Sequence, residues 1–391
     1  MKGEMSRIRS LRASQKPDGG WAWTPPDKQK EILGKKGKEV SGTTARNARD
    51  LMRIARITGD SVCLSTGMKA LKFLETVDRI PRGGQTWEVP LHTPDVIVAA
   101  DACMASIDAY RITADKHYLD EARYWAYTGI PFFYMWKLPE RPIMLYASIP
   151  VLGATMYVGS WFGQPVQWCG IAHIYPLLHL TKYDNSLPWR KLAEGMTICS
   201  MQQQFTMDLR MYPDKKDTPD SKLYWDYRKG IEDNVGLYPD NFALVNGKQV
   251  CWEYMISPNT HYPLTRCIYN FLGVEPEAQT EILRSGDARV HITTVAKITK
   301  AELAGGKISV DLQFFPEEIC QGIVCGISRP AKVTKNGTEI PFFEAIDDPA
   351  EGWEFHTRSA DSQEGFLVWK ITHSRSDKLE ISGSSVLPVG K

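Results

Sequence analysis

The sequence has no long apolar run and no excess of one charge. No stretch approaches the roughly 20 apolar residues that cross a bilayer, and residues 1–14 carry charges without the apolar segment of a secretion signal. Forty-seven basic and 46 acidic residues give a net charge of +1, and neither sign gathers into a long run. We therefore expect neither nucleic acid nor a membrane as a partner, and a cytoplasmic location by default unless the chain is truncated at its N-terminus. The oligomeric state is not determined by these features.

The cysteines lack the spacing of a metal site or of a disulfide framework. The chain has eight of them, scattered along its length with no Cys-x-x-Cys pair. Several lie in helical patterns beside apolar residues, where a reduced thiol behaves as a small hydrophobic group. The sequence therefore predicts free, buried thiols in a reducing compartment, with no metal and no other cofactor.

An internal repeat organises the larger, N-terminal part of the chain. The triplet Arg56–Thr58 ends one helical pattern and returns as Arg111–Thr113 at the end of another. A short break and a second helical pattern follow each copy. Two looser copies come later, with breaks at 183–185 and at Gly273, the last one expected to end in a helix over 277–283. The repeat predicts an array of α-hairpins.

The connections between the hairpins carry the unusual side chains. In an array of like-oriented hairpins these connections lie at one end. They are rich in tryptophan, carboxylates and histidine, a mixture that suits sugars because aromatic faces stack on C–H groups while hydroxyls need polar partners. The sequence therefore predicts a sugar-binding rim formed by 18–23, 83–95, 132–168, 224–234 and 252–266.

Two segments carry a family resemblance. Gln15–Trp21 closes a helix with Asp-Gly-Gly-Trp, and Thr86–Asp95 opens the next hairpin. Together with the repeat, they resemble the six-hairpin glycosidase superfamily and its α-toroid polysaccharide lyase relatives. The resemblance implies a carbohydrate-active enzyme built on an α/α toroid. The sequence accounts for fewer helices than six hairpins need, so we expect an incomplete ring, truncated at its start.

Other α-toroid enzymes have motifs that this sequence lacks. A class II terpene cyclase needs an Asp-x-Asp-Asp acid motif, which is absent. Prenyltransferases and lanthionine cyclases bind zinc through cysteine and histidine ligands, and no Cys-His-Gly follows Trp168-Cys169-Gly170. We therefore interpret Cys169 as structural.

The last part of the chain changes to a two-residue period. Alternating apolar positions occur in 290–294, 308–312, 322–327 and 365–371, and Asn336-Gly337 is a tight-turn signal. This pattern predicts a small antiparallel β-sandwich with no cluster of catalytic side chains. The predicted fold class is mostly α with a C-terminal all-β part. Its two domains are an incomplete six-hairpin α/α toroid over 1–284 and the β-sandwich over 285–391.

Glycoside hydrolysis is the chemistry that we favour for the rim. It needs two carboxyl groups across the scissile bond, one as acid and one as base or nucleophile. Glu88 and Glu253 each follow a tryptophan, whose indole raises a carboxyl pKa toward that of a general acid. Asp95 and Asp226 are further candidates, and Asp95 is equally well placed as a partner of the next helix's N-terminus. The residues expected to bind substrate are Trp21, Trp87, His92, Trp161 and Trp252.

Two other functions stay open. β-Elimination from a uronic acid needs a base, usually Tyr or His, and a group that holds the carboxylate. Those residue types occur together in Asn259, His261, Tyr262 and Arg266. A toroid that binds glycans without catalysis is the second alternative. Which sugar is bound, which linkage is cut, and whether action is endo or exo have no readable pattern.

Overall fold

The computed structural model describes most of the chain, in two compact units. The first unit contains Met1–Arg49, Met68–Tyr110 and Asp115–Val274, and the second contains Asp50–Gly67, Arg111–Ala114 and Glu275–Lys391. The described residues are 2–136, 145–153, 165–202, 258–275, 277–344, 351–358 and 362–387, with short strands between 238 and 255; side chains are described outside 1–5 and 203–262.

The first hairpin joins α2 (Ser41–Thr58) to α3 (Ser61–Thr76). Gly59 makes the turn with φ 65°, a left-handed conformation that glycine adopts without a steric penalty. Asp60 then caps α3, because its carboxylate accepts the backbone N–H of Cys63 at 2.7 Å. The predicted break between these helices is confirmed.

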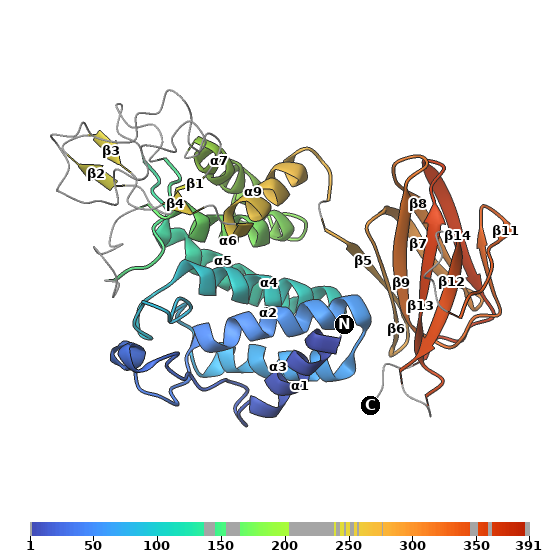
Figure 1. Ribbon diagram of the computed structural model, residues 1–391, viewed down its shortest axis with the longest axis horizontal. Coiled ribbons are helices and arrows are strands. Elements are labelled where there is room, and N and C mark those ends of the chain that lie inside the picture. Colours follow the sequence, from blue (N-terminus) through green and yellow to red (C-terminus); the bar gives the residue numbers. More distant parts are fainter. Residues whose placement is uncertain are drawn as a thin grey trace. The chain divides into compact units, whose positions relative to one another are not determined.

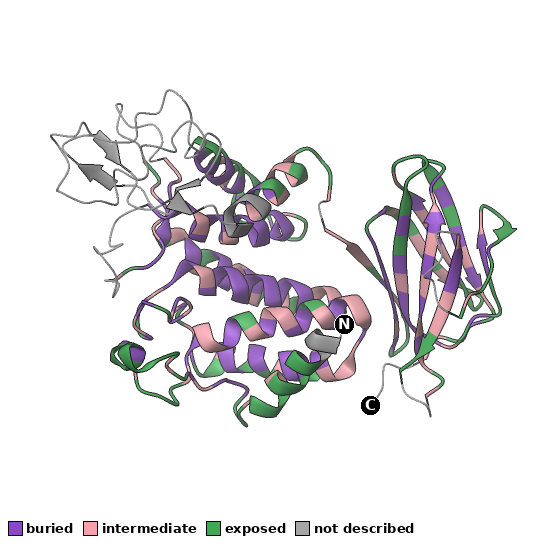
Figure 2. Cartoon of the chain, in the orientation of Figure 1, coloured by how far each residue is buried: buried purple, intermediate pink, exposed green. Residues whose placement is uncertain are grey.

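The second hairpin has the same plan, with α4 (Val96–Thr113) and α5 (Lys116–Gly129) on either side of Ala114. Asp115 caps α5 by accepting the N–H of His117 at 3.0 Å. Helix α4 is buried on nearly all sides (Figure 2), as its apolar composition requires. Within the described part of the chain, no helix combines the length and apolar character that crossing a membrane needs.

The third hairpin joins α6 (Gln167–Leu180) to α7 (Trp189–Gln202). Asp184 fixes its turn by accepting the indole N–H of Trp189 at 2.5 Å and the Nε–H of Arg123, on α5, at 2.8 Å. Helix α1 (Lys2–Ser14) precedes the first hairpin, as predicted, and the short helices η1 (Lys28–Leu33) and η2 (Ile130–Phe132) lie in the connections (Figure 1).

The predicted fourth hairpin is wrong in its second half. Its first half is the helix α9 (Pro258–Phe271), which contacts α6. The second half is not helical, because Gln279–Ser285 form a strand, β5, paired antiparallel with β6 (Ala288–Thr294). Ile282 is the one buried residue of β5, so the segment offers no apolar stripe at helical spacing. The β part therefore begins before the predicted boundary at 284/285.

Two five-stranded antiparallel sheets form the β part, in the orders β11-β10-β14-β8-β7 and β12-β13-β9-β6-β5. All four predicted strand segments lie within observed strands. The remaining strands are β7 (Lys297–Ala304), β8 (Lys307–Gln313), β9 (Ile319–Ile327), β10 (Lys332–Lys335), β11 (Thr338–Glu339), β12 (Gly352–Thr357), β13 (Gly365–Thr372) and β14 (Ser376–Ser382); the first unit holds the short β1 (Tyr238–Pro239), β2 (Ala243–Val245), β3 (Lys248–Val250) and β4 (Tyr254–Met255).

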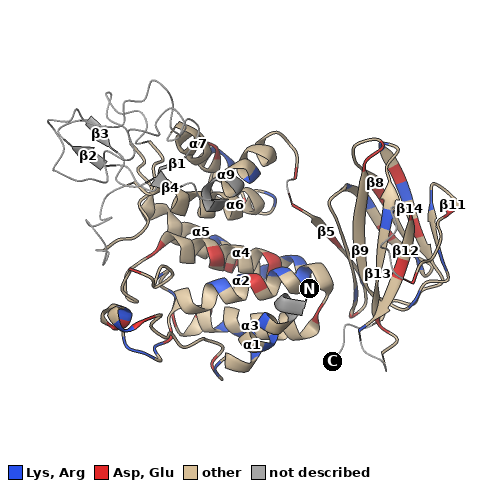
Figure 3. Cartoon of the chain, viewed as in Figure 1, with Lys and Arg blue, Asp and Glu red and all other residues tan. Residues whose placement is uncertain are grey.

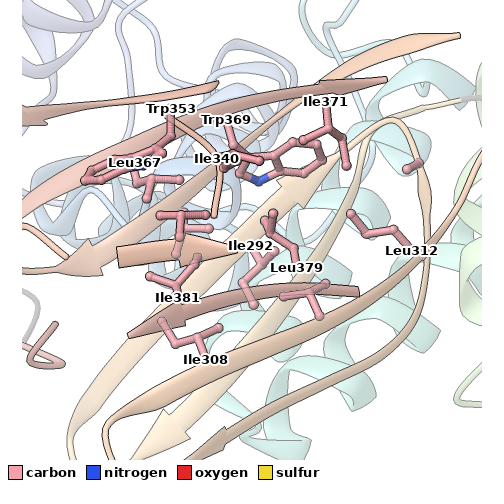
Figure 4. Close-up of a cluster of buried hydrophobic side chains, with 14 of the residues drawn as sticks. Ile292, Ile308, Leu312, Ile340, Trp353, Leu367, Trp369, Ile371, Leu379 and Ile381 are labelled. Carbon is pink, nitrogen blue, oxygen red and sulfur yellow. The ribbon is translucent and has the colours of Figure 1, made fainter. Parts of the chain in front are cut away.

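The two large sheets share one hydrophobic core (Figure 4). Ile292, Leu367 and Trp369 enter it from one sheet, and Ile308 and Leu379 from the other, each at most 1% exposed. Two apolar sheet faces packed in this way form a β-sandwich.

Buried and more exposed residues alternate along β14, and charged residues occur in the same sheet (Figure 3). Lys307 on β8 and Lys378 on β14 both pair with Glu380, at 2.7 Å and 3.1 Å. The β10–β11 turn is formed by Asn336 and Gly337, with φ 50° and 84°, as its sequence predicts.

Gly322 on β9 leaves no space for a methyl group. A Cβ there would lie 2.1 Å from Cζ2 of Trp369, its fully buried partner on β13. We therefore expect Gly322→Ala to lower the free energy of unfolding by about 1–3 kcal/mol, measured by urea denaturation. In a Trp369→Phe background the same change should cost less, because the indole edge that meets the methyl group is absent. An equal cost in both backgrounds would contradict this steric explanation.

Candidate functional site

The connections between hairpins are hydrogen-bonded to one another. The carbonyl of Leu33 accepts the N–H of Leu91 at 2.9 Å, which joins the connections 15–40 and 77–95. The N–H of Val96 donates to the carbonyl of Pro150 at 3.1 Å, which joins the start of α4 to the third connection. We call the described parts of 15–40, 77–95 and 130–166 the connection layer. It includes described parts of three of the segments predicted to form the sugar-binding rim, whose binding role stays a prediction.

Asp95 is the centre of the connection layer. Its carboxylate accepts three N–H groups: the backbone N–H of Ile97 at 2.9 Å, the backbone N–H of Gln85 at 2.9 Å, and the side-chain amide of Gln85 at 3.1 Å. Asp95 and Gln85 are fully buried. The bond to Ile97 caps α4, so the structure gives Asp95 the helix-partner role, one of the two that the sequence left open.

The environment of Asp95 places its titration near neutral pH. Burial raises the pKa of Asp95 to about 7, since water is excluded from the charged form, while the N–H groups of Ile97 and Gln85 act in the opposite direction. The nearby Asp101 raises the pKa further. A carboxyl group with such a pKa exchanges its proton in the physiological range, although its complete burial keeps it from direct contact with a solute.

Glu88 lies three residues beyond Gln85, beside an aromatic pair of which one ring, Trp87, is exposed. The Glu88 side chain is 3% exposed and accepts the indole N–H of Trp87 at 3.2 Å. Trp87 is 41% exposed and stacks on Trp168, with ring centroids 6.3 Å apart and planes 24° apart. The structure therefore brings a largely desolvated carboxyl group and an accessible indole stack together.

Two buried glutamines, Gln85 and Gln167, fix the position of Trp168 relative to Trp87. The side-chain carbonyl of Gln85 accepts the thiol of Cys169 at 3.5 Å, next to Trp168. Gln167, at the start of α6, accepts the backbone N–H of Ser148 at 2.9 Å and donates to the carbonyl of Met196 at 3.3 Å. The N-terminus of α6, and with it Trp168, is thus fixed against two connections and α7.

The sequence patterns did not indicate Gln85, Gln167 or the stacking role of Trp168. Each glutamine lies one or two residues before a rim tryptophan, so a polar anchor next to an aromatic was a usable signal. Cys169 is buried and hydrogen-bonded, in agreement with a structural role. All seven cysteines within the described residues are free and buried, as predicted.

Three other candidates have described side chains. Trp21 is 5% exposed and donates its indole N–H to the carbonyl of Leu11 at 2.9 Å, so it packs under α1 instead of presenting a stacking face. The turn before it contains Gly19 in a left-handed conformation, with φ 98°. His92 is exposed in the connection layer. Arg266 on α9 lies over the ring of Tyr175, 3.5 Å from its centroid.

The remaining predicted site residues have side chains outside the described set, and their roles stay predictions. They are Trp161, Asp226, Trp252, Glu253, Asn259, His261 and Tyr262. Among the side chains that are described, no three His, Cys, Asp or Glu residues gather into a group able to hold a metal ion.

No family model and no curated protein matches the sequence. Solved structures with a similar arrangement include an α-1,6-mannanase of Salegentibacter sp. HEL1_6 in complex with α-1,6-mannotetrose: 11% identity, 68% of this chain, 65% of that chain, TM-score 0.44. An unsaturated glucuronyl hydrolase specific for heparin is 14% identical, with 62% of this chain and 51% of that chain covered and a TM-score of 0.36. The endo-β-1,4-glucanase of Acetobacter xylinum is 12% identical, with 69% of this chain and 73% of that chain covered and a TM-score of 0.39.

Each of these similarities covers part of the chain, 62–69% of its residues. The chain spans less than two-thirds of the length of the mannanase and about half of the length of the glucuronyl hydrolase. With identities of 14% or less and TM-scores below 0.5, these similarities assign no activity to the chain.

The buried Asp95 should make the stability of the protein depend on pH. Its pKa is higher in the folded chain, at about 7, than its ordinary 3.8, so the folded state binds more protons between those values and loses stability as the pH rises. Asp95→Asn keeps a capping side chain and removes the titration. Between about pH 4 and about pH 7, the free energy of unfolding of the variant should therefore rise relative to that of the wild type by on the order of 2–4 kcal/mol, measured by urea denaturation.

Asp184 provides a control of opposite sign. Burial raises the pKa of Asp184, but hydrogen bonds from Ser186, Trp189 and Arg123 outweigh it, and the net shift is downward. The stability contributed by Asp184 is lost as the pH falls below 3.8, the ordinary pKa of an Asp. Asp184→Asn should therefore reduce the pH dependence of the free energy of unfolding in the acid range only. Parallel pH profiles for the wild type and Asp95→Asn would disprove the role given to Asp95.

Proposed function

We propose that this chain is a carbohydrate-active enzyme, and that its activity is glycoside hydrolysis at the connection layer. The observation that carries the proposal is the position of Glu88, 3% exposed and hydrogen-bonded to the exposed indole of Trp87, which stacks on Trp168. Exposed indole faces bind the C–H faces of sugar rings, and a desolvated carboxyl group is suited to donate a proton.

Hydrolysis requires a second carboxyl group on the other side of the glycosidic bond. Glu253 is the proposed partner, because it follows Trp252 as Glu88 follows Trp87 and comes from a different connection. Glu88 is the proposed acid that protonates the leaving oxygen, and Glu253 activates water or attacks the anomeric carbon. Their carboxyl groups should lie about 5–10 Å apart in the substrate complex. His92, which is exposed, is proposed to orient substrate hydroxyls.

The indole stack also suggests how the substrate is held. One face of a pyranose covers about one indole, so Trp87 supplies a subsite next to the acid, and Trp168 supports that indole from behind. Asp95 and Gln85 are proposed to position the site without touching the sugar, since both are fully buried. Trp161 and Trp252 are proposed to add further stacking faces.

Replacing the proposed acid should abolish turnover and spare binding. Glu88→Gln keeps the size and the hydrogen-bond acceptor of the side chain but has no proton to donate. We expect kcat on oligosaccharides to fall on the order of 10²-fold or more, with Kd nearly unchanged, because general acid catalysis acts in the transition state. Glu194→Gln, at an exposed position on α7, is the matched control and should leave both constants unchanged.

The reaction products distinguish hydrolysis from its alternative. Activity that survives Glu88→Gln, disappears with Tyr262→Phe and yields unsaturated uronides would replace the proposal with β-elimination. Binding without turnover by the wild type, across neutral and acidic glycans, would leave only a glycan-binding role.

The stack itself can be tested by fluorescence. Titration with an oligosaccharide should change tryptophan emission in the wild type. Trp87→Ala should weaken binding by roughly 10-fold or more, as expected for the loss of about 1.4 kcal/mol or more of stacking, whereas Trp87→Phe should retain part of it. Equal affinities for the wild type and Trp87→Ala would remove Trp87 from the site.

A further inference from the structure

A second group of reactive side chains lies in the β-sandwich. The β8–β9 connection, Phe314–Glu318, and the β13–β14 connection, His373–Arg375, each pass from one sheet to the other. They run side by side, since the N–H of Glu317 donates to the carbonyl of His373 at 2.8 Å and the N–H of His373 donates to the carbonyl of Glu318 at 2.9 Å. Two crossovers joined in this way define one end of the sandwich.

Three side chains meet under these crossovers in the order thiol, imidazole, carboxylate. The Sγ of Cys320, on β9, lies 2.8 Å from Nε2 of His373. The Nδ1 of the same ring lies 2.8 Å from Oδ2 of Asp377, on β14. A nucleophile in hydrogen-bond contact with a base, and the base in contact with an orienting carboxylate, is the geometric signature of an activated nucleophile.

The carboxylate fixes which nitrogen of His373 carries the proton. Asp377 also accepts the backbone N–H of Ser374 at 2.9 Å and the side-chain amide of Asn336 at 2.7 Å. Burial raises the pKa of Asp377, but these bonds and His373 outweigh it and the net shift is downward, so the group is ionised. An ionised acceptor at Nδ1 requires a proton there, and Nε2 is left to accept the thiol proton of Cys320.

Before reaction, Cys320 is a protonated thiol and His373 is a neutral imidazole. Burial raises the pKa of Cys320 to about 11, which keeps the sulfur protonated at neutral pH. Burial lowers the pKa of His373, although Asp377 acts against that shift, so the imidazole is a free base. Lys335 and Glu351 are the other charges that act on the ring, and Thr294 lies 3.9 Å from Sγ. Proton transfer from sulfur to Nε2 therefore generates the thiolate when it reacts.

One short connection separates the triad from solvent. Cys320, His373 and Asp377 are each 3% exposed, and the ring of Phe314 lies over His373 with centroids 5.3 Å apart. The next residue, Phe315, is 68% exposed. Three backbone hydrogen bonds join the two crossovers, the third from the N–H of Phe314 to the carbonyl of Arg375 at 3.3 Å. We expect local opening of these bonds, which is ordinary for exposed loops, to uncover the sulfur.

We propose that Cys320, His373 and Asp377 form a thiol-modification site for small, uncharged α,β-unsaturated carbonyl compounds. His373 takes the thiol proton while Sγ forms a bond to the β-carbon of the compound. The π pair of the C=C bond moves to the α-carbon, which takes the proton back from Nε2. The thiol is thus added across the double bond with no leaving group and no change of oxidation state at His373 or Asp377. Charged electrophiles are disfavoured because the site is buried beside a carboxylate.

Cys325 is the matched control for this site. It lies on the same strand, is 1% exposed, and has its pKa raised by burial to about 12. No hydrogen bond from an imidazole reaches its sulfur among the described contacts. The comparison between the two thiols therefore controls for general unfolding of the sandwich, and the His373 variant below assigns the remaining difference to the imidazole.

The experiment is modification of the folded, full-length chain with acrylamide, followed by peptide mass spectrometry. We expect adducts at Cys320 to form about 10-fold or more faster than at Cys325, the lower range of general-base catalysis. The rate at Cys320 should level off above roughly pH 7, when His373 is fully in its base form, while the rate at Cys325 keeps rising with its thiolate fraction. Equal rates, or parallel pH profiles, in the wild type would overturn the proposal.

Two variants then assign the effect to the triad. His373→Asn should reduce the Cys320 rate to that of Cys325, with circular dichroism confirming the fold. Asp377→Asn should reduce the rate at Cys320 by a smaller factor, because an amide no longer selects the Nδ1–H tautomer of His373. A folded His373→Asn variant that retains the fast Cys320 reaction would also overturn the proposal. If both variants unfold, the wild-type pH profiles decide alone.

Discussion

The buried carboxylate of Asp95 is the constraint on which the candidate site depends. A fully buried carboxyl group needs hydrogen-bond donors, and here they come from the first turn of α4 and from both the backbone and the side chain of Gln85. The loop backbone approaches the carboxylate closely at Gly84, where a Cβ would lie 3.0 Å from Oδ2 of Asp95. Glu88 and Trp87 follow within three residues, so their placement is inherited from this contact.

The same contact extends to α6. Gln85 uses its amide N–H on Asp95 and its carbonyl on the thiol of Cys169, which lies next to Trp168. One glutamine therefore links the helix cap, the loop that carries Glu88, and the helix that carries the second indole. An acid and a binding surface placed by a common buried network keep their relative geometry without direct contact between the network and a substrate.

The β-sandwich uses its polar groups differently. Its core is apolar and shared by both sheets, and at the crossover end the buried Asp377 accepts hydrogen bonds from Ser374, Asn336 and His373. The proposed thiol chemistry and the proposed hydrolysis belong to different compact units and use no residue in common. Each can fail without affecting the other.

Local patterns in the sequence determined the elements of this protein. Asp60, Asp115 and the Asn336-Gly337 pair act within a few residues of themselves, so the hairpin breaks and the β-turn were predictable from capping and turn chemistry. The helix assigned to 277–283 failed because a short segment carries little periodicity, and pairing with β6 decided its conformation. The choice of Trp87 and Glu88 as candidates rests on their residue types and on their position in a connection. Only the tertiary structure decided that Trp21 is buried, that Trp168 stacks on Trp87, and that Cys320 meets His373, because these contacts join residues distant in sequence and depend on how the hairpins and sheets pack.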